Sequence, residues 1–246
     1  MIGRRRRAIN WTETLTERWR VVPIAGPGRR SSEDLLALSD QDLLDFLRDT
    51  RDREGALEQR GWYRLLYSEF VTGRRLLDIG CGLAMDTLTF AERGATVTCA
   101  DLAATNVELV SRVARLLGLD DRVETVHLDS LEMEGRFSGA FDAILGIGSL
   151  HNAPQEVMGP ELRGLAPYLA PGGRWLQFAY PRIRWERDGK PAFERWGEMT
   201  DGPGTPWCEW YDAAKLIELL QPFPFRLVFE TEWHDGEFNW IDLVLD

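Results

Sequence analysis

The sequence predicts an α/β fold in which a doubly wound, mostly parallel seven-stranded sheet ends in an antiparallel hairpin. Two observations support this prediction. Between residues 75 and 220, short apolar runs alternate with amphipathic segments of helical length, the pattern of consecutive β-α units. Two further strand-like runs, 225–233 and 238–245, are joined by a short turn that contains glycine, which indicates a C-terminal hairpin. Residues 181–210 do not fit a simple connection and are expected to form an insertion after the fifth strand.

The segment before the first strand is predicted to be helical, apart from an irregular stretch over 1–30. Ser31-x-x-Asp34 and Ser39-x-x-Asp42 are typical helix starts, because the serine oxygen can accept hydrogen bonds from free N–H groups. A third helix is expected over 56–70. These features predict an N-terminal helical cap, residues 1–55, ahead of a main domain over 56–246.

The main domain is expected to open with a strand and to continue as β-α units. The run 141–147 is apolar almost throughout, as expected of a strand that is buried on both faces. Thr105 and Glu108 form a capping-box pattern at the start of one helix. The elements are predicted as strand 76–79, helix 85–93, strand 95–101, helix 105–117, strand 122–127, strand 141–147, helix 155–169, strand 174–180 and helix 211–220.

Composition excludes several classes of partner. The formal net charge of −11, from 40 acidic and 29 basic side chains, disfavours binding to nucleic acid or to anionic membranes. A basic run, Arg4 to Arg7, indicates a solvated terminus or, alternatively, an anion-binding arm. No apolar segment typical of a signal peptide or a membrane span follows it. The three cysteines, Cys81, Cys99 and Cys208, lack metal-ligand spacing, so we expect a cytoplasmic protein with reduced thiols and no metal.

A ligand site is predicted where the parallel strands end. In open α/β sheets, ligands bind at the carboxyl ends of the strands, where the direction of the connections reverses. Asp78 ends the first strand, and Gly80 and Gly82 follow in a turn that lets backbone approach a ligand closely. Asp101 ends the second strand and is placed to accept hydrogen bonds from two ribose hydroxyls. Dinucleotide-binding enzymes share the spacing between Gly80 and Asp101, so this spacing alone does not distinguish one class of nucleotide-like ligand from another.

The residues around the glycine turn favour a cationic ligand over a pyrophosphate. A dinucleotide fingerprint requires a third glycine at position 85, where this chain has Met85. The carboxylate of Asp78 stands where dinucleotide folds have an apolar residue. A carboxylate attracts an ammonium or sulfonium group and repels a phosphate. A nicotinamide dehydrogenase is therefore disfavoured.

The stretch Leu77-Asp78-Ile79-Gly80-Cys81-Gly82-Leu83-Ala84 resembles the first motif of class I S-adenosylmethionine-dependent methyltransferases. Later segments resemble further motifs of that family in the correct order, including 141–152 of the small-molecule branch and the turn 169–173. The resemblance covers about residues 56–180 and the final hairpin. It implies S-adenosyl-L-methionine as the cofactor, bound by Asp78, Gly80, Cys81, Gly82, Asp101, Leu102, Asp129, Ser130, Gly146 and Tyr63.

Within that resemblance, Asp101 matches the ribose-binding acid and Asp129 the residue that contacts the adenine amine. Two positions depart from the family pattern. Ala84 replaces the commoner glycine and is expected to be tolerated if its φ stays negative. Asn152 replaces a second histidine that many relatives have, which leaves the assignment of the base open.

His151 is the histidine expected beside the transferred methyl group. It is a candidate catalytic base for an oxygen nucleophile or, alternatively, a structural hydrogen-bonding group. The insertion 181–210 is predicted to be a substrate lid, although a folded surface loop is the simpler alternative. Its aromatic and acidic side chains favour a neutral or cationic substrate. The residues predicted to contact substrate are Tyr67, Asn152, Tyr180, Trp185 and Trp207, with core packing as the alternative for Tyr63 and Tyr67.

The function predicted from the sequence is therefore transfer of a methyl group from S-adenosylmethionine to an oxygen or nitrogen nucleophile of a small organic molecule. A protein or RNA methyltransferase is the alternative within the enzymes. A protein that binds S-adenosylmethionine without transferring its methyl group is the alternative outside them.

Overall fold

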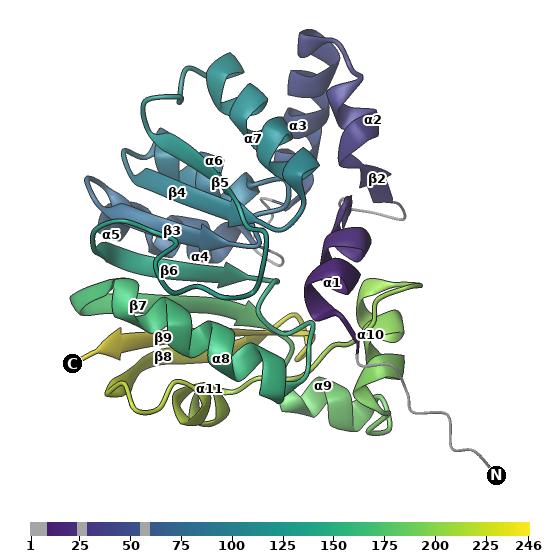
Figure 1. Cartoon of the computed structure of the whole chain (residues 1–246), viewed down its shortest axis with the longest axis vertical. Coiled ribbons are helices and arrows are strands. Elements are labelled where there is room, and N and C mark those ends of the chain that lie inside the picture. The colour runs from purple at the N-terminus through teal and green to yellow at the C-terminus, as the bar shows by residue number, and fades with distance from the viewer. Residues whose placement is uncertain (1–8, 24–28, 55–59) are drawn as a thin grey trace.

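A seven-stranded sheet forms the centre of the computed structural model, which describes residues 9–23, 29–54 and 60–246 (Figure 1). The strand order is β5-β4-β3-β6-β7-β9-β8. The first five of these strands run parallel, and β9 is antiparallel to both β7 and β8. The strands are β3 (Arg75–Ile79), β4 (Thr96–Asp101), β5 (Val123–His127), β6 (Phe141–Ile147), β7 (Leu169–Ala179), β8 (Phe225–Trp233) and β9 (Phe238–Leu245). The predicted fold class is confirmed.

The sheet separates two apolar cores, because successive side chains of a strand point to opposite faces. Leu76 of β3 belongs to one core, and its neighbour Leu77 belongs to the other. Ala143 and Ile144 of β6 divide in the same way. The helices around the main sheet are α4 (Gly61–Leu66), α5 (Ser68–Val71), α6 (Met85–Glu92), α7 (Ala104–Leu116), α8 (Gln155–Leu165) and α11 (Ala213–Leu219).

The N-terminal segment contains a helix where we expected irregular chain. Helix α1 (Trp11–Trp19) begins after Asn10, whose side-chain oxygen accepts a hydrogen bond from the N–H of Glu13 at 3.3 Å. Leu15 is buried, and a single buried leucine among threonines and glutamates gives only a weak periodic signal. A short hairpin of β1 (Val21–Pro23) and β2 (Arg29–Ser31) follows. The basic run Arg4 to Arg7 lies outside the described residues.

The two predicted serine caps are confirmed. Ser31 Oγ accepts a hydrogen bond from the N–H of Asp34 at 3.0 Å at the start of α2 (Ser32–Leu36). Ser39 Oγ accepts one from the N–H of Asp42 at 3.2 Å at the start of α3 (Asp40–Glu54). Each serine satisfies an N–H group that has no partner within its helix. Both helices therefore begin where the sequence pattern places them.

Three predicted helices differ in their bounds. The helix expected over 56–70 is divided into α4 and α5 at Tyr67, and residues 55–59 lie outside the described part. The capping box at Thr105 is wrong, because α7 begins at Ala104 and no side chain caps it. Asp101 instead accepts a hydrogen bond from the N–H of Ala103 at 2.8 Å. Helix α8 ends at Leu165, before a 3-10 turn (Ala166–Tyr168).

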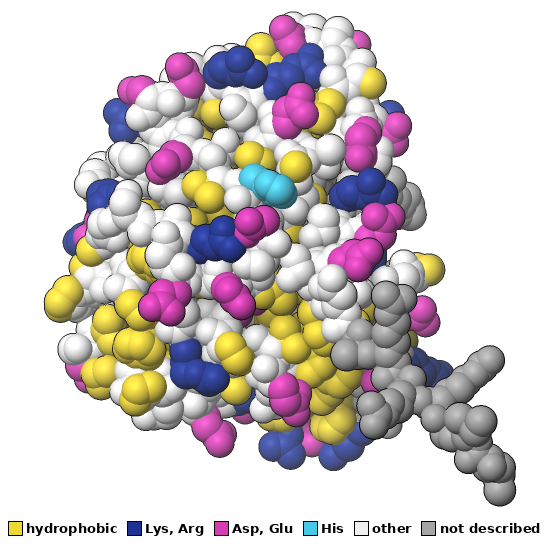
Figure 2. Space-filling model, in the orientation of Figure 1, with side chains coloured by type: hydrophobic (Ala, Val, Ile, Leu, Met, Phe, Trp, Pro, Cys, Tyr) yellow, Lys and Arg dark blue, Asp and Glu magenta, His cyan; other side chains and the backbone are white. Residues whose placement is uncertain are grey.

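The surface mixes charges of both signs. Figure 2 shows acidic and basic side chains interspersed with apolar ones across one face. Among the described residues, none of the helices is both long enough and apolar enough to span a bilayer.

Leu77→Ala should show how strongly the packing of β3 supports the fold. Leu77 is fully buried, so its truncation leaves a cavity and should lower the free energy of unfolding by about 2–5 kcal/mol. Leu66, at the end of α4, is 57% exposed, and Leu66→Ala should change that free energy by less than about 0.5 kcal/mol. Urea denaturation followed by circular dichroism measures both, and equal effects would contradict the described packing.

Candidate functional site

A cavity of about 370 Å³ lies at the carboxyl ends of β3, β4 and β6. The turn between β3 and α6 forms one of its walls. Leu15 and Trp19 of α1 line it as well, as do Thr200 and Asp201 at the end of α10 (Phe193–Asp201). The N-terminal helix and the insertion after β7 therefore complete a site that the sheet alone leaves open (Figure 1).

The turn after β3 depends on left-handed backbone. Gly80 has a φ of +70°, and a Cβ there would lie 2.5 Å from Cβ of Ser149. Ser149 is held in this position because its Oγ donates a hydrogen bond to the carbonyl of Ile79 at 2.5 Å. Glycine at position 80 is thus required both by φ and by the close approach of the chain after β6.

Ala84 departs from our expectation of a negative φ. Its φ is +53° and its ψ is 34°, in the left-handed region. For a residue with a Cβ, this conformation costs about 1–2 kcal/mol. Ala84 is buried against the apolar core and directly precedes α6. The expected tolerance through a negative φ is wrong, and the surrounding packing holds the strained turn in place.

Two predicted carboxylates face the cavity. Asp78 is 3% exposed and accepts a hydrogen bond from Thr87 Oγ1 at 2.5 Å. Burial raises the pKa of Asp78 to about 7. Asp101 accepts hydrogen bonds from the N–H of Gly82 at 2.9 Å and of Ala103 at 2.8 Å, and burial raises its pKa as well. Both line the cavity, and an ionised carboxylate oxygen can accept more than one hydrogen bond.

One acidic and one basic side chain at the same site are not among the residues predicted from the sequence. Asp86, in the first turn of α6, accepts hydrogen bonds from Arg64 Nε and Tyr63 OH, each at 2.8 Å. Burial acts to raise the pKa of Asp86, but the guanidinium groups of Arg64 and Arg60 bring it below its ordinary value. Arg60 Nη1 lies 3.9 Å from the carboxylate of Asp86 and also lines the cavity.

Tyr63, predicted to close over the cofactor, lies in the apolar core instead. Its ring stacks on Trp240 with centroids 4.3 Å apart, and its side chain is fully buried. The predicted substrate residue Tyr67 is also in this core, where its OH donates a hydrogen bond to Asp242 and accepts one from Trp240 Nε1. Core packing, which the sequence left open for both tyrosines, is their role in this structure. Arg60, which directly precedes α4, lines the cavity, whereas Tyr63 and Tyr67 are not among the described lining residues.

Asp129, Ser130 and Gly146 are not brought into the described lining. The carboxylate of Asp129 is 72% exposed and forms an ion pair with Arg136. Ser130 Oγ accepts a hydrogen bond from Arg136 Nη2 at 2.7 Å. Gly146 instead packs against Leu150: a Cβ at position 146 would lie 2.8 Å from Leu150 Cδ1. The structure does bring Asp78, Gly80, Cys81, Gly82, Asp101, Leu102, Asn152 and Tyr180 together around the cavity.

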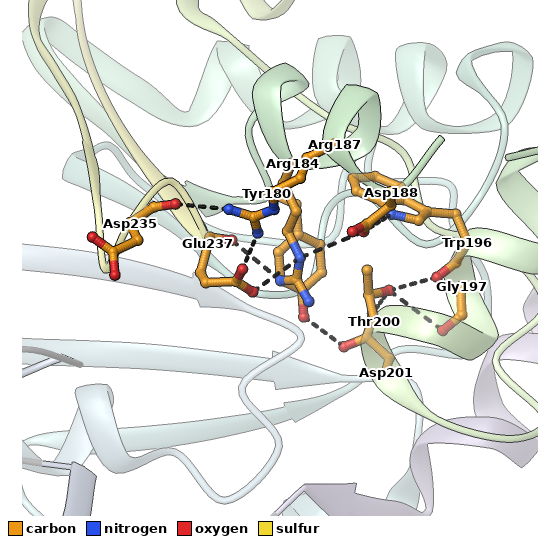
Figure 3. A network of polar contacts seen from close by, with 10 residues as sticks. All are labelled: Tyr180, Arg184, Arg187, Asp188, Trp196, Gly197, Thr200, Asp201, Asp235 and Glu237. Carbon is orange, nitrogen blue, oxygen red and sulfur yellow. Dashed lines mark hydrogen bonds and ion pairs between the residues drawn. The ribbon is translucent and has the colours of Figure 1, made fainter. Parts of the chain in front are cut away.

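The insertion after β7 contains α9 (Arg182–Arg187) and α10, and it is fastened to the turn between β8 and β9 (Figure 3). Arg184 Nε lies 3.2 Å from the carboxylate of Glu237, and Arg187 also forms an ion pair with Glu237. Tyr180 OH donates a hydrogen bond to Asp201 Oδ1 at 2.9 Å. These contacts hold the end of α10 over the cavity.

Helix α1 is joined to the insertion by hydrogen bonds from one arginine. Arg18 Nη2 donates to the carbonyl of Asp201 at 2.7 Å, and Arg18 Nε donates to Thr205 Oγ1 at 3.0 Å. Trp207, predicted to face substrate, instead packs edge-on against Trp11 at 6.3 Å between ring centroids. Trp185 donates a hydrogen bond through Nε1 to the carbonyl of Pro191 at 2.9 Å and lies outside the described lining.

His151 also lies outside the described lining of the cavity. It is 1% exposed, and its Nδ1 has no hydrogen-bond partner among the described residues. Burial lowers the pKa of His151, while the neighbouring Asp201 acts to raise it. Unlike His151, the neighbouring Asp201 does line the cavity.

Residues 76–173 match the family model of a methyltransferase domain. This segment, which runs from β3 to the early part of β7, is thus similar to methyltransferase domains. It is 37% identical over 106 residues to a ubiquinone biosynthesis O-methyltransferase of Xanthomonas oryzae pv. oryzae, covering 42% of each chain. It is 35% identical over 121 residues to a demethylmenaquinone methyltransferase of Clavibacter sepedonicus, covering 48% of this chain and 47% of that protein. The chain thus matches these relatives over less than half of their length.

The whole methyltransferase fold is shared with solved structures of low sequence identity. Geranyl diphosphate C-methyltransferase from Streptomyces coelicolor A3(2) aligns with a TM-score of 0.65 at 14% identity, over 98% of this chain and 99% of that one. At this identity, the likeness concerns the fold. It extends across the N-terminal helices and the insertion, which lie outside the matched family model.

Glu161→Gln should change the pH dependence of the stability of this protein. Glu161 of α8 lines the cavity, its Oε2 has no hydrogen-bond partner among the described residues, and burial raises its pKa from 4.5 to about 8. The folded protein therefore holds this proton between about pH 4.5 and 8 while the unfolded chain has lost it, so stability falls as pH rises through that window. The variant should match the wild type near pH 4 and exceed its free energy of unfolding above pH 8.

Glu156→Gln is the matched control, because Glu156 lies exposed in the first turn of the same helix. Urea denaturation at several pH values gives the comparison. An advantage of Glu161→Gln that does not grow between pH 4.5 and 8 would show that this carboxyl is not desolvated in the native state.

Proposed function

We propose that this protein transfers a methyl group from S-adenosyl-L-methionine to an oxygen or nitrogen atom of a small organic molecule. The observation that carries the proposal is the convergence, in one covered cavity, of the glycine turn after β3 with the buried carboxylates of Asp78 and Asp101. The names of the relatives, which concern ubiquinone and menaquinone biosynthesis, support a small-molecule acceptor.

The charges in the lining fit a cofactor with two cationic groups. Among the described lining residues, Arg60 stands against the carboxyl groups of Asp78, Asp86, Asp101 and Asp201, while Glu161 holds its proton up to about pH 8. Asp78 would accept hydrogen bonds from the ammonium group of the methionine moiety, and Arg60 would face its carboxylate. Asp101 would accept hydrogen bonds from the ribose hydroxyls, and Leu102 would pack against adenine. When bound, the cofactor would supply a methyl group on a sulfonium: the acceptor atom would form the new bond to carbon, and the electron pair of the broken C–S bond would stay on sulfur.

The residues of this chain contribute mainly position and exclusion of water. Methyl transfer is an in-line displacement, so the acceptor atom must be held opposite the C–S bond that breaks. Phe178, Tyr180 and Phe238 supply an aromatic wall on the side of the cavity nearest α10, and α1 covers it together with α10. An acidic, aromatic wall favours neutral or cationic acceptors over phosphorylated or carboxylated ones. The assignment of His151 as a proton acceptor remains a sequence-based prediction.

Isothermal titration with S-adenosylmethionine should distinguish the contributions of Asp101 and Asp129 to cofactor affinity. Asp101→Ala removes hydrogen bonds between a carboxylate and ribose, which should weaken binding about 10- to 100-fold. Asp129→Ala should leave the affinity within about twofold, because its exposed carboxylate pairs with Arg136 outside the cavity. Equal losses in both variants would contradict the described site, and absence of binding by the wild type would refute the proposal.

Product formation tests the transfer step itself. The wild type should release S-adenosylhomocysteine in the presence of a reactive phenol or amine from a panel, detected by mass spectrometry of the methylated product. A protein that binds S-adenosylmethionine and methylates no member of a broad panel would support the alternative of binding without transfer.

A further inference from the structure

Three side chains from separate segments meet beside the cavity. His151 follows β6, Asp201 ends α10, and Cys208 lies in the segment after α10. A ring nitrogen of His151, a carboxylate oxygen of Asp201 and Sγ of Cys208 all lie within 4.8 Å of one another. His151 and Cys208 are buried, at 1% and 0% exposure, whereas Asp201 also lines the cavity. The cluster therefore extends from the buried interior of the insertion, at Cys208, to the wall of the cavity, at Asp201.

The histidine in this cluster has an unsatisfied polar atom. Nδ1 of His151 is buried and has no hydrogen-bond partner among the described residues. Buried polar atoms are almost always paired with protein, water or a ligand, so an orphaned one calls for an explanation. We propose that His151, Asp201 and Cys208 bind a divalent transition-metal ion of the softness of zinc, outside the cofactor-binding part of the cavity.

The chemistry of the donors fits such an ion. Imidazole, thiolate and carboxylate are the three protein ligand types that Zn²⁺ uses, and catalytic sites commonly combine three protein ligands with one open position. The thiolate and the carboxylate together balance the charge of the ion, so the buried thiolate of Cys208 would not be left unpaired. Binding releases the proton of the Cys208 thiol to solvent, and nothing is oxidised or reduced.

The geometry requires only a small adjustment. Zinc bonds of 2.0–2.3 Å in a tetrahedron place donor atoms about 3.3–3.8 Å apart. Donor atoms within 4.8 Å of one another therefore need to close by at most about 1–1.5 Å, which side-chain rotation can supply. The ligands come from three places in the sequence, so no spacing pattern could reveal them.

The carboxylate of Asp201 is already oriented by neighbours, as metal ligands usually are. Tyr180 OH donates a hydrogen bond to Oδ1 at 2.9 Å, and Thr200 Oγ1 lies 2.9 Å from Oδ2, as it does from the carbonyl of Trp196, so that its proton can serve either acceptor (Figure 3). Arg18 fixes the backbone of the same residue through the carbonyl at 2.7 Å. An ion at this point would fasten the insertion to the end of β6. In this assignment, His151 is a ligand and not the proton acceptor.

The segments that carry the ligands are also joined by hydrogen bonds to backbone carbonyls, so the cluster does not depend on one flexible side chain. The carbonyl of His151 accepts a hydrogen bond from the N–H of Glu209 at 2.9 Å. The N–H of Cys208 donates to the carbonyl of Phe193 at 3.1 Å, and Asn152 Nδ2 donates to the carbonyl of Trp207 at 3.2 Å. The insertion is therefore held against the chain after β6 at the point where the ligands meet.

The test uses the full chain, stripped of metal by chelation and dialysis, and titrated with Zn²⁺ and with Co²⁺ as a spectroscopic probe. We expect one equivalent of Zn²⁺ to bind per chain and to raise the midpoint of thermal unfolding. Co²⁺ should give a sulfur-to-cobalt charge-transfer band and the visible bands of a tetrahedral site. Cys208→Ser should abolish the charge-transfer band, and His151→Gln should weaken Zn²⁺ binding by at least about 10- to 100-fold.

Matched controls are available for both ligand types. Cys99→Ala removes a different buried thiol, and His234→Asn removes a histidine at the turn after β8; both should keep the spectrum and the affinity. Circular dichroism verifies that each variant is folded, and the charge-transfer band of His151→Gln gives a second readout if Cys208→Ser unfolds. The proposal is overturned if the wild type binds no stoichiometric metal, or if the band survives in folded Cys208→Ser. Because metal binding is read without cofactor, this outcome is independent of methyl transfer.

Discussion

The close approach between the turn after β3 and the segment after β6 is the constraint on which the site depends. Gly80 touches Ser149 so tightly that no side chain fits, and Ser149 in turn binds the carbonyl of Ile79. These contacts place the two strand ends side by side and leave the buried carboxylates of Asp78 and Asp101 facing the same space. The left-handed conformation of Ala84 is part of this constraint, because the turn is held despite its local cost.

The remainder of the chain covers that space and sets its charge. Helix α1 and the end of α10 come from opposite ends of the sequence and are joined through Arg18. The ion pairs of Arg184 and Arg187 with Glu237 hold the insertion against the C-terminal hairpin. These contacts come from the periphery of the fold, whereas the glycine turn and the strand ends belong to its centre.

The strands could be predicted because their signal is local. Apolar runs such as 141–147, and acids at strand ends such as Asp78 and Asp101, are visible in the sequence and lie where they were expected. Helix α1 was missed because one buried leucine gives little periodicity. Tyr63 was assigned to the site on its position in the chain, but the apolar core offers its ring a stacking partner in Trp240. Arg60 and the cluster of His151, Asp201 and Cys208 depend on contacts between distant segments, which no local pattern reports.

We propose above all that S-adenosylmethionine binds in the cavity bounded by the glycine turn, Asp101, α1 and α10. A crystal structure with S-adenosylhomocysteine tests it most directly. The ribose hydroxyls should lie within hydrogen-bonding distance of Asp101, with the amino acid end between Asp78 and Arg60. Density for the ligand anywhere else, or against Asp129 with Asp101 unoccupied, would contradict the account.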